Sequence, residues 1–157
     1  MKALVVYDSK FGNTKVVAQQ IAEGLGGGDP VLCRDARDSD LAGVDLLVVG
    51  GPTQGHGLSP DLRTYLDHLA AETVTDMQFA TFDTRPTWPR LLAGSAAAQA
   101  AKRLTKKGAH MLVGPESFLV KEGNGPLLDG ELSRAKEWAM QVGAAAGLVE
   151  PEMAGAL

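Results

Sequence analysis

The sequence contains a single cysteine, Cys33, among its 157 residues. One cysteine excludes an internal disulfide and any metal site built from cysteine alone. The residues before it, Val31 and Leu32, are apolar. We therefore predict a buried thiol in a short strand, because a buried free cysteine behaves as a small hydrophobic residue.

Long hydrophobic runs and a large excess of one charge are also absent. The longest apolar stretches fall far short of a membrane span, and Met1-Lys2 leads directly into an apolar strand pattern instead of a signal peptide. The formal net charge of −4 at pH 7 is mild, which argues against nucleic-acid binding and against a membrane surface as partner. We expect a cytoplasmic protein with one domain over residues 1–157.

The start of the chain predicts a strand, a polar loop and a helix. Ala3 to Tyr7 form an apolar run, Gly12 interrupts the polar residues that follow, and a helical period begins after Thr14. Such a loop directs backbone N–H groups and free helix N-terminal donors at one point, which suits a phosphate. The glycine spacing of dinucleotide-binding and nucleoside-triphosphate loops is missing, so a single terminal phosphate is the favoured ligand. The alternative is that these polar residues only cap the helix.

A second loop follows the apolar run from Val44 to Gly50 and is rich in glycine up to Gly57. A continuous apolar run of this length is typical of a central parallel strand that is covered on both faces. Because parallel α/β sheets bind ligands at the carboxyl ends of their strands, we expect this loop to lie beside the first. Within it, His56 is either a proton donor to a ligand or an ordinary polar loop residue.

A third loop, Asp83 to Arg90, follows a fourth strand predicted at Met77 to Phe82. Trp88 is either a residue that stacks on a planar ligand or a loop anchor between two prolines. Arg85 and Arg90 are either solvated or recruit an anionic substrate or partner.

The whole pattern predicts an α/β fold, a three-layer sandwich around a five-stranded parallel sheet of order 2-1-3-4-5. Helices are expected after the first loop, after Ser59-Pro60, after Ser95 and around Trp138, which is expected in the core. The fifth strand is predicted at Ala109 to Val113, and an extended pattern resumes after Gly114-Pro115. Response-regulator receiver domains share this order, but they need an aspartate and a lysine at strand ends that here read Gly50-Gly51 and Gly114-Pro115.

The first loop, Ser9-Lys10-Phe11-Gly12-Asn13-Thr14, resembles the phosphate loop of flavodoxins, usually Ser/Thr-x-Ser/Thr-Gly-Asn-Thr. Phe11 stands where that family has a hydroxyl. The second loop is similar to the family's second loop, except that Gln54 stands where a Trp or Tyr commonly covers the flavin ring. The third loop corresponds by position, although the family's glycines and acidic residue there are replaced by Arg85 and Arg90.

This resemblance implies bound FMN. No metal is expected, because the acids Asp35, Asp38 and Asp40 are scattered between two elements, which is more typical of a solvated loop than of a metal site. The residues that the resemblance assigns to the cofactor are Ser9, Lys10, Phe11, Gly12, Asn13 and Thr14 at the phosphate, and Pro52, Thr53, Gln54, Gly55, His56, Asp83, Thr84, Arg85 and Trp88 around the ring. In ordinary flavodoxins an acidic surround disfavours the anionic reduced flavin. A guanidinium near the ring acts in the opposite direction by Coulomb attraction.

Three functions are compatible with the resemblance. The first is an electron carrier that docks transiently with redox partner proteins. The second is an FMN-dependent reductase of a small-molecule acceptor such as a quinone, which the open side at Gln54, His56 and the two arginines favour. The third is an interaction module that kept the fold without the cofactor, because the hydroxyl at Phe11 and the aromatic ring at Gln54 are both missing.

Overall fold

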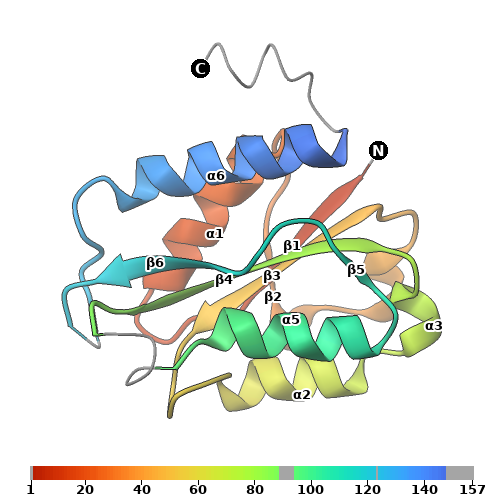
Figure 1. The fold of residues 1–157 in the computed structure, drawn as a ribbon, viewed down its shortest axis with the longest axis horizontal. Coiled ribbons are helices and arrows are strands. Elements are labelled where there is room, and N and C mark those ends of the chain that lie inside the picture. Colours follow the sequence, from red (N-terminus) through yellow and green to blue (C-terminus); the bar gives the residue numbers. More distant parts are fainter. Residues whose placement is uncertain (1, 89–93, 123, 148–157) are drawn as a thin grey trace.

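The computed structural model describes residues 2–88, 94–122 and 124–147, and its centre is a parallel sheet (Figure 1). The strands are β1 (Ala3–Tyr7), β2 (Val31–Leu32), β3 (Leu46–Pro52), β4 (Gln78–Pro86), β5 (His110–Met111) and β6 (Glu116–Val120). Their order is β2-β1-β3-β4-β5, and β6 also pairs with β4. All strand pairings in this sheet are parallel, so the carboxyl ends of the strands all point to the same end of the sheet.

Helices cover both faces of this sheet and give the molecule three layers (Figure 1). They are α1 (Asn13–Gly24), α2 (Pro60–His68), α3 (Ala71–Val74), α5 (Ala96–Lys106) and α6 (Glu131–Ala146), with 3-10 turns η1 (Cys33–Asp35) and η2 (Asp38–Leu41). The helices α1 and α6 lie on one face, and α2 and α5 lie on the other. The predicted sandwich and its strand order are confirmed.

Each face of the sheet has its own hydrophobic core. Beneath α1 and α6, the rings of Phe82, Phe118 and Trp138 meet edge to face with centroids 6.0 to 6.3 Å apart. Trp138 is 8% exposed, so its predicted place in the core is confirmed. Beneath α2 and α5, Leu62 and Leu104 are buried against the other face. Apolar burial on both faces explains the continuous apolar sequence of β3.

The fourth strand is longer than the sequence predicted. It continues beyond Phe82 to Pro86, so Asp83 to Pro86 belong to the strand and not to the third loop. The extension has a partner, because β6 pairs with it from Phe82↔Glu116 to Pro86↔Val120. The fifth strand predicted at Ala109 to Val113 is the short β5, and the extended pattern after Gly114-Pro115 is β6; both pair with the same edge of β4.

Cys33 is 4% exposed, as predicted, although it opens η1 and is not part of β2. Burial, followed by the nearby Asp8 carboxylate, raises the pKa of the Cys33 thiol to about 12. The thiol is therefore protonated at neutral pH and unreactive.

No helix in the described part of the chain is long and apolar enough to cross a membrane.

Candidate functional site

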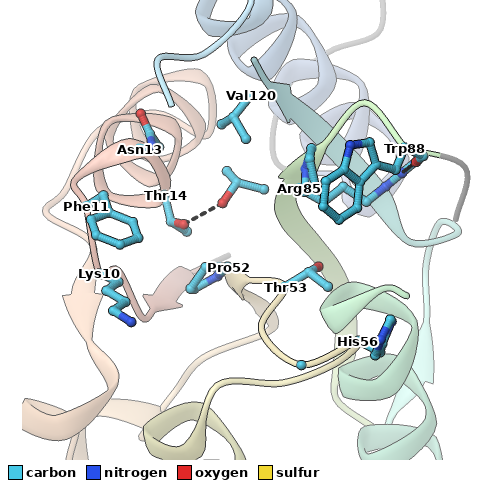
Figure 2. A pocket seen from close by; sticks show the side chains of 13 residues that line it. Lys10, Phe11, Asn13, Thr14, Pro52, Thr53, His56, Arg85, Trp88 and Val120 are labelled. Carbon is cyan, nitrogen blue, oxygen red and sulfur yellow. Dashed lines mark hydrogen bonds between the residues drawn. The ribbon is translucent and has the colours of Figure 1, made fainter. Parts of the chain in front are cut away.

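A cavity of about 260 Å³ opens at the carboxyl ends of β1, β3 and β4 (Figure 2). All three predicted loops contribute to it, together with the end of β6. Its lining residues are Lys10, Phe11, Asn13, Thr14, Pro52, Thr53, Gly55, His56, Thr84, Arg85, Pro86, Trp88 and Val120. The sheet edge therefore brings together segments that are far apart in the sequence, as the parallel topology predicted.

The first loop is shaped by Ser9 and Gly12. Ser9 Oγ accepts hydrogen bonds from the backbone N–H groups of Gly12 at 3.2 Å and of Lys15 at 3.3 Å. Gly12 has a φ of 92° at the N-cap of α1, a left-handed conformation that glycine adopts without steric cost. These two residues hold the loop's shape but do not line the cavity.

The same loop leaves backbone donors unused. Side-chain capping of α1 is incomplete, because the N-cap residue Gly12 has no side chain and Ser9 Oγ accepts from only one N–H of the first turn, that of Lys15. Within the described part of the chain, four N–H groups of the loop have no acceptor: those of Lys10, Phe11, Asn13 and Thr14. Free N–H groups at a helix N-terminus, with the positive end of the helix dipole, form an anion site.

Two side chains of this loop are hydrogen-bonded to other segments of the chain. Thr14 is 2% exposed, and its Oγ1 lies 2.8 Å from Oγ1 of Thr84 on β4, a pair drawn dashed in Figure 2. Asn13 Nδ2 donates to the backbone oxygen of Asn124 at 2.9 Å. A Cβ atom at Gly125 would collide with the Asn13 side chain, so glycine is required there for this close approach.

The second loop is a tight turn from Gln54 to Gly57. The backbone groups of these two residues bond each other, at 2.8 Å and 3.0 Å. The residues between them, Gly55 and His56, have φ values of 54° and 70°, as a primed hairpin turn requires. This turn places Gly55 and His56 on the cavity and leaves Gln54 off its lining.

The end of β4 brings a charged and an aromatic residue to the opposite side (Figure 2). Arg85 Nη1 donates to the backbone oxygen of Trp88 at 2.8 Å. Arg85 Nε is buried and has no partner among the described residues. The Trp88 side chain is 62% exposed, so it lies at the rim and is not a buried anchor. Arg90, the other arginine predicted for this loop, lies outside the described residues.

Asp83 does not line the cavity, in contrast to the sequence expectation. Its carboxylate is fully buried, and Oδ2 accepts hydrogen bonds from Ser95 Oγ at 2.7 Å and from Ala97 N at 3.0 Å. These donors belong to the start of α5, where a negative charge is favourable. The contacts make Asp83 an anchor for that helix.

The predicted cofactor site and the lining of the cavity share most, but not all, of their residues. Four predicted residues are absent from the lining: Ser9, Gly12, Gln54 and Asp83. Two lining residues were not predicted, Pro86 and Val120. The signal for Val120 was present in the sequence, because an extended pattern resumes after Gly114-Pro115.

The lining is electropositive although the chain as a whole is negative. It contains Lys10 and Arg85 but no Asp or Glu among the described residues, whereas the net charge of the chain is −4. The Lys10 ammonium lies 5.3 Å from the centroid of the Phe11 ring. Phe11 is 53% exposed. An anionic ligand is therefore favoured over a neutral or cationic one.

The family model of a flavodoxin domain matches residues 4–112. The chain belongs to the flavodoxin domain family. No curated protein sequence matches it significantly.

Solved flavodoxin structures share its fold at low sequence identity. A flavodoxin from the domain Archaea is 20% identical, with a TM-score of 0.79 over 94% of this chain and 99% of that one. Oxidised Flavodoxin 1 from Bacillus cereus is 20% identical, with a TM-score of 0.73 over 90% and 97%. The WrbA-like flavodoxin from Agrobacterium tumefaciens is 20% identical, with a TM-score of 0.72 over 93% and 97%.

Membership of the flavodoxin family implies FMN as the cofactor, and the cavity of this chain fits such a molecule. One side offers free backbone donors and Lys10 for a phosphate. The opposite side offers Trp88, with an exposed aromatic surface, and Arg85, with an unpartnered buried N–H. A phosphate group and a planar ring with polar edges match these two kinds of surface.

Proposed function

We propose that this flavodoxin-family protein is an electron carrier that holds FMN non-covalently in the cavity and docks transiently with redox partner proteins. The observation that carries the proposal is the convergence of three separate loops on one electropositive cavity with unused backbone donors on one side. When bound, FMN supplies the redox chemistry, because its ring accepts and releases one or two electrons. The protein's own residues position it and set its surroundings.

The loop from Ser9 to Thr14 binds the phosphate in this proposal. Its free N–H groups and the N-terminus of α1 provide donors in a fixed arrangement. The missing hydroxyl at Phe11 removes one side-chain donor but no backbone donor, since the Phe11 N–H is itself free. The Lys10 ammonium adds a positive charge to the same end.

The second loop and the end of β4 enclose the ring in this proposal. The peptide at Thr53 is fixed, because its N–H donates to Thr84 O at 2.9 Å and its Oγ1 accepts from Ala96 N at 3.1 Å. Trp88 covers part of the ring and remains exposed enough to contact a partner. Such an exposed edge suits transfer of electrons by brief contact between proteins.

A second candidate is an FMN-dependent reductase of a quinone-type small molecule. Two observations favour it: His56 lines the cavity, where its imidazole can supply a proton to a substrate, and Gln54 leaves the second loop without an aromatic cover. Turnover of NAD(P)H with a quinone by the isolated protein supports the reductase. Reduction that requires a separate partner reductase supports the carrier.

The first experiment is an absorbance spectrum of the purified protein before and after FMN is added and the excess removed. Retained flavin bands in the blue and near-ultraviolet support both redox candidates. A colourless protein that does not retain FMN contradicts both and leaves the cofactor-free interaction module. The single domain over residues 1–157 and the cytoplasmic location stay predictions.

A further inference from the structure

The positive charges of the cavity lie at its two opposite sides. Lys10 belongs to the first loop, and Arg85 lies at the end of β4, across the cavity from that loop (Figure 2). No carboxylate lines the cavity within the described part of the chain. The two cations therefore act on different parts of any ligand that spans the cavity.

Arg85 is held in place, and its charge is not neutralised. Its backbone pairs with Leu119 across the ladder of β4 and β6, and Nη1 is bonded to the carbonyl oxygen of Trp88. It forms no ion pair with any described carboxylate. Asp83, two residues earlier, bonds to Ser95 and the start of α5 through Oδ2, and its buried Oδ1 forms no hydrogen bond to Arg85 or to any other described residue. The guanidinium is therefore a fixed charge whose buried Nε–H lacks an acceptor.

The two ends of FMN respond differently to reduction. Two electrons and one proton, which adds at N5, convert the neutral oxidised ring into a ring with one negative charge. The phosphate keeps the same charge throughout. If the phosphate is held at the first loop, the opposite side of the lining would hold the ring, and Arg85 is the cation on that side.

We propose that Arg85 makes this cavity bind reduced FMN more tightly than oxidised FMN, which raises the two-electron potential of the bound flavin above that of free FMN. The inference rests on the FMN binding proposed above and goes beyond it by assigning the sign of the redox tuning to one residue. Lys10 strengthens binding of both forms equally, because it acts on the phosphate. Tighter binding of the reduced form stabilises it by Coulomb attraction to the fixed guanidinium.

The test compares dissociation constants of oxidised FMN and of FMN reduced anaerobically with dithionite, and the two-electron potential measured against redox dyes. We expect the wild-type protein to bind reduced FMN about tenfold more tightly, in the lower range that Coulomb's law gives for a partly screened pair. This ratio corresponds to a potential about 30 mV above that of free FMN. Arg85→Gln is expected to bring the ratio close to one, whereas Arg85→Lys, which keeps the charge, retains most of it.

Lys10→Gln is the matched control, because it removes the other cation of the lining. It is expected to weaken both forms by the same factor and to leave the potential unchanged. A wild-type ratio of one or below overturns the inference even if Arg85→Gln fails to fold. An equal loss for both forms in Arg85→Gln also overturns it and leaves the proposed FMN binding standing. A wild-type protein that binds neither form overturns the proposed function itself.

Discussion

The two sides of the cavity offer different kinds of chemistry. The first loop offers backbone N–H groups, held by Ser9 and by the left-handed Gly12, so its capacity for a phosphate depends on conformation more than on side-chain identity. The end of β4 offers individual side chains, Arg85 and Trp88. In the proposed function, the first side therefore tolerates a residue such as Phe11 where a hydroxyl is usual, whereas each substitution on the second side is expected to change the site.

The largest effect is expected where the first loop is tied to the rest of the cavity. Replacing Asn13 and Thr14 together with alanine removes two polar side chains that hold and line this side. We expect FMN to bind about 100-fold more weakly, because the loop loses its bonds to Asn124 and Thr84 and with them the fixed arrangement of its backbone donors, each of which contributes about 1.5 to 3 kcal/mol when it bonds a charged group. Riboflavin, which lacks the phosphate, should bind within about threefold of wild type in the same fluorescence titration.

The control for this pair is Lys15→Ala, which removes an exposed side chain of the same helix but keeps the backbone N–H that donates to Ser9. It should leave both ligands unaffected. An equal loss of FMN and riboflavin in the double variant would show that the first loop does not hold the phosphate.

The next largest effect distinguishes a residue that stabilises the fold near the end of β4 from one that contacts the ligand. Asp83→Ala removes the buried carboxylate that accepts from Ser95 and Ala97. We expect the free energy of unfolding in urea to fall by about 2 kcal/mol, as for loss of a charged hydrogen-bond acceptor at a helix start. FMN affinity of the folded variant should change less than about threefold. A large loss of FMN affinity with unchanged stability would show that Asp83 contacts the ligand. The control is Glu137→Ala, which removes an exposed carboxylate of α6.

A smaller effect is expected at the rim. Trp88→Ala removes an exposed indole that lines the cavity, and its loss should weaken FMN about tenfold, in line with the upper range for aromatic stacking. Riboflavin should weaken by the same factor, because the ring is common to both ligands. Loss of FMN binding alone would place Trp88 at the phosphate and reverse the assignment of the two sides.

The smallest effect concerns the anchoring of β6, whose end supplies Val120 to the cavity. The Arg134 guanidinium bonded to Glu131 lowers the pKa of that carboxyl below its usual 4.5. Because the folded-state pKa is lower, the stabilisation is complete above pH 4.5 and disappears as the pH falls through the folded-state value. Glu131→Gln should cost about 1 kcal/mol at pH 7, allowing for the partial exposure of Arg134.

The same substitution should make almost no difference at a pH below the folded-state pKa of Glu131. Urea unfolding at several pH values measures this convergence. Parallel pH profiles for the two proteins would show that the ionised carboxylate does not hold β6.

The sequence was sufficient to predict the layers and the strand order, because apolar runs, helical periods and polar loops alternate without interruption. It was also sufficient to place three loops at one edge, since all parallel strands end on the same side. The extension of β4 to Pro86 could not be read from Asp83 to Arg85, three polar residues that looked like a loop. Their strand conformation depends on pairing with β6, which is a long-range contact.

The details of the site depend on which side chains point into the cavity, and the sequence does not show these directions. Gln54 and Asp83 are neighbours of lining residues in the sequence, but neither lines the cavity. Gln54 begins the tight turn that ends at Gly57, and the Asp83 carboxylate is hydrogen-bonded to the start of α5. The free donors of the first loop were predicted because a strand-to-helix turn leaves them unpaired whatever its side chains are. The direction of a side chain is therefore harder to predict from sequence than the presence of a free backbone donor.

The hydrogen bonds along β6 have a consequence for self-association. An exposed strand edge is a template on which another chain can add a strand. Here the Leu119 N–H donates to Glu131 at 2.7 Å, the Leu119 oxygen accepts from Leu128 N at 2.9 Å, and the Lys121 N–H donates to Pro126 O at 2.9 Å. Arg134 also donates to the Ser117 oxygen. These contacts occupy outer backbone groups of β6 and of the residue after it, so the outer side of β6 is closed to a second molecule by backbone and side-chain groups of the protein itself.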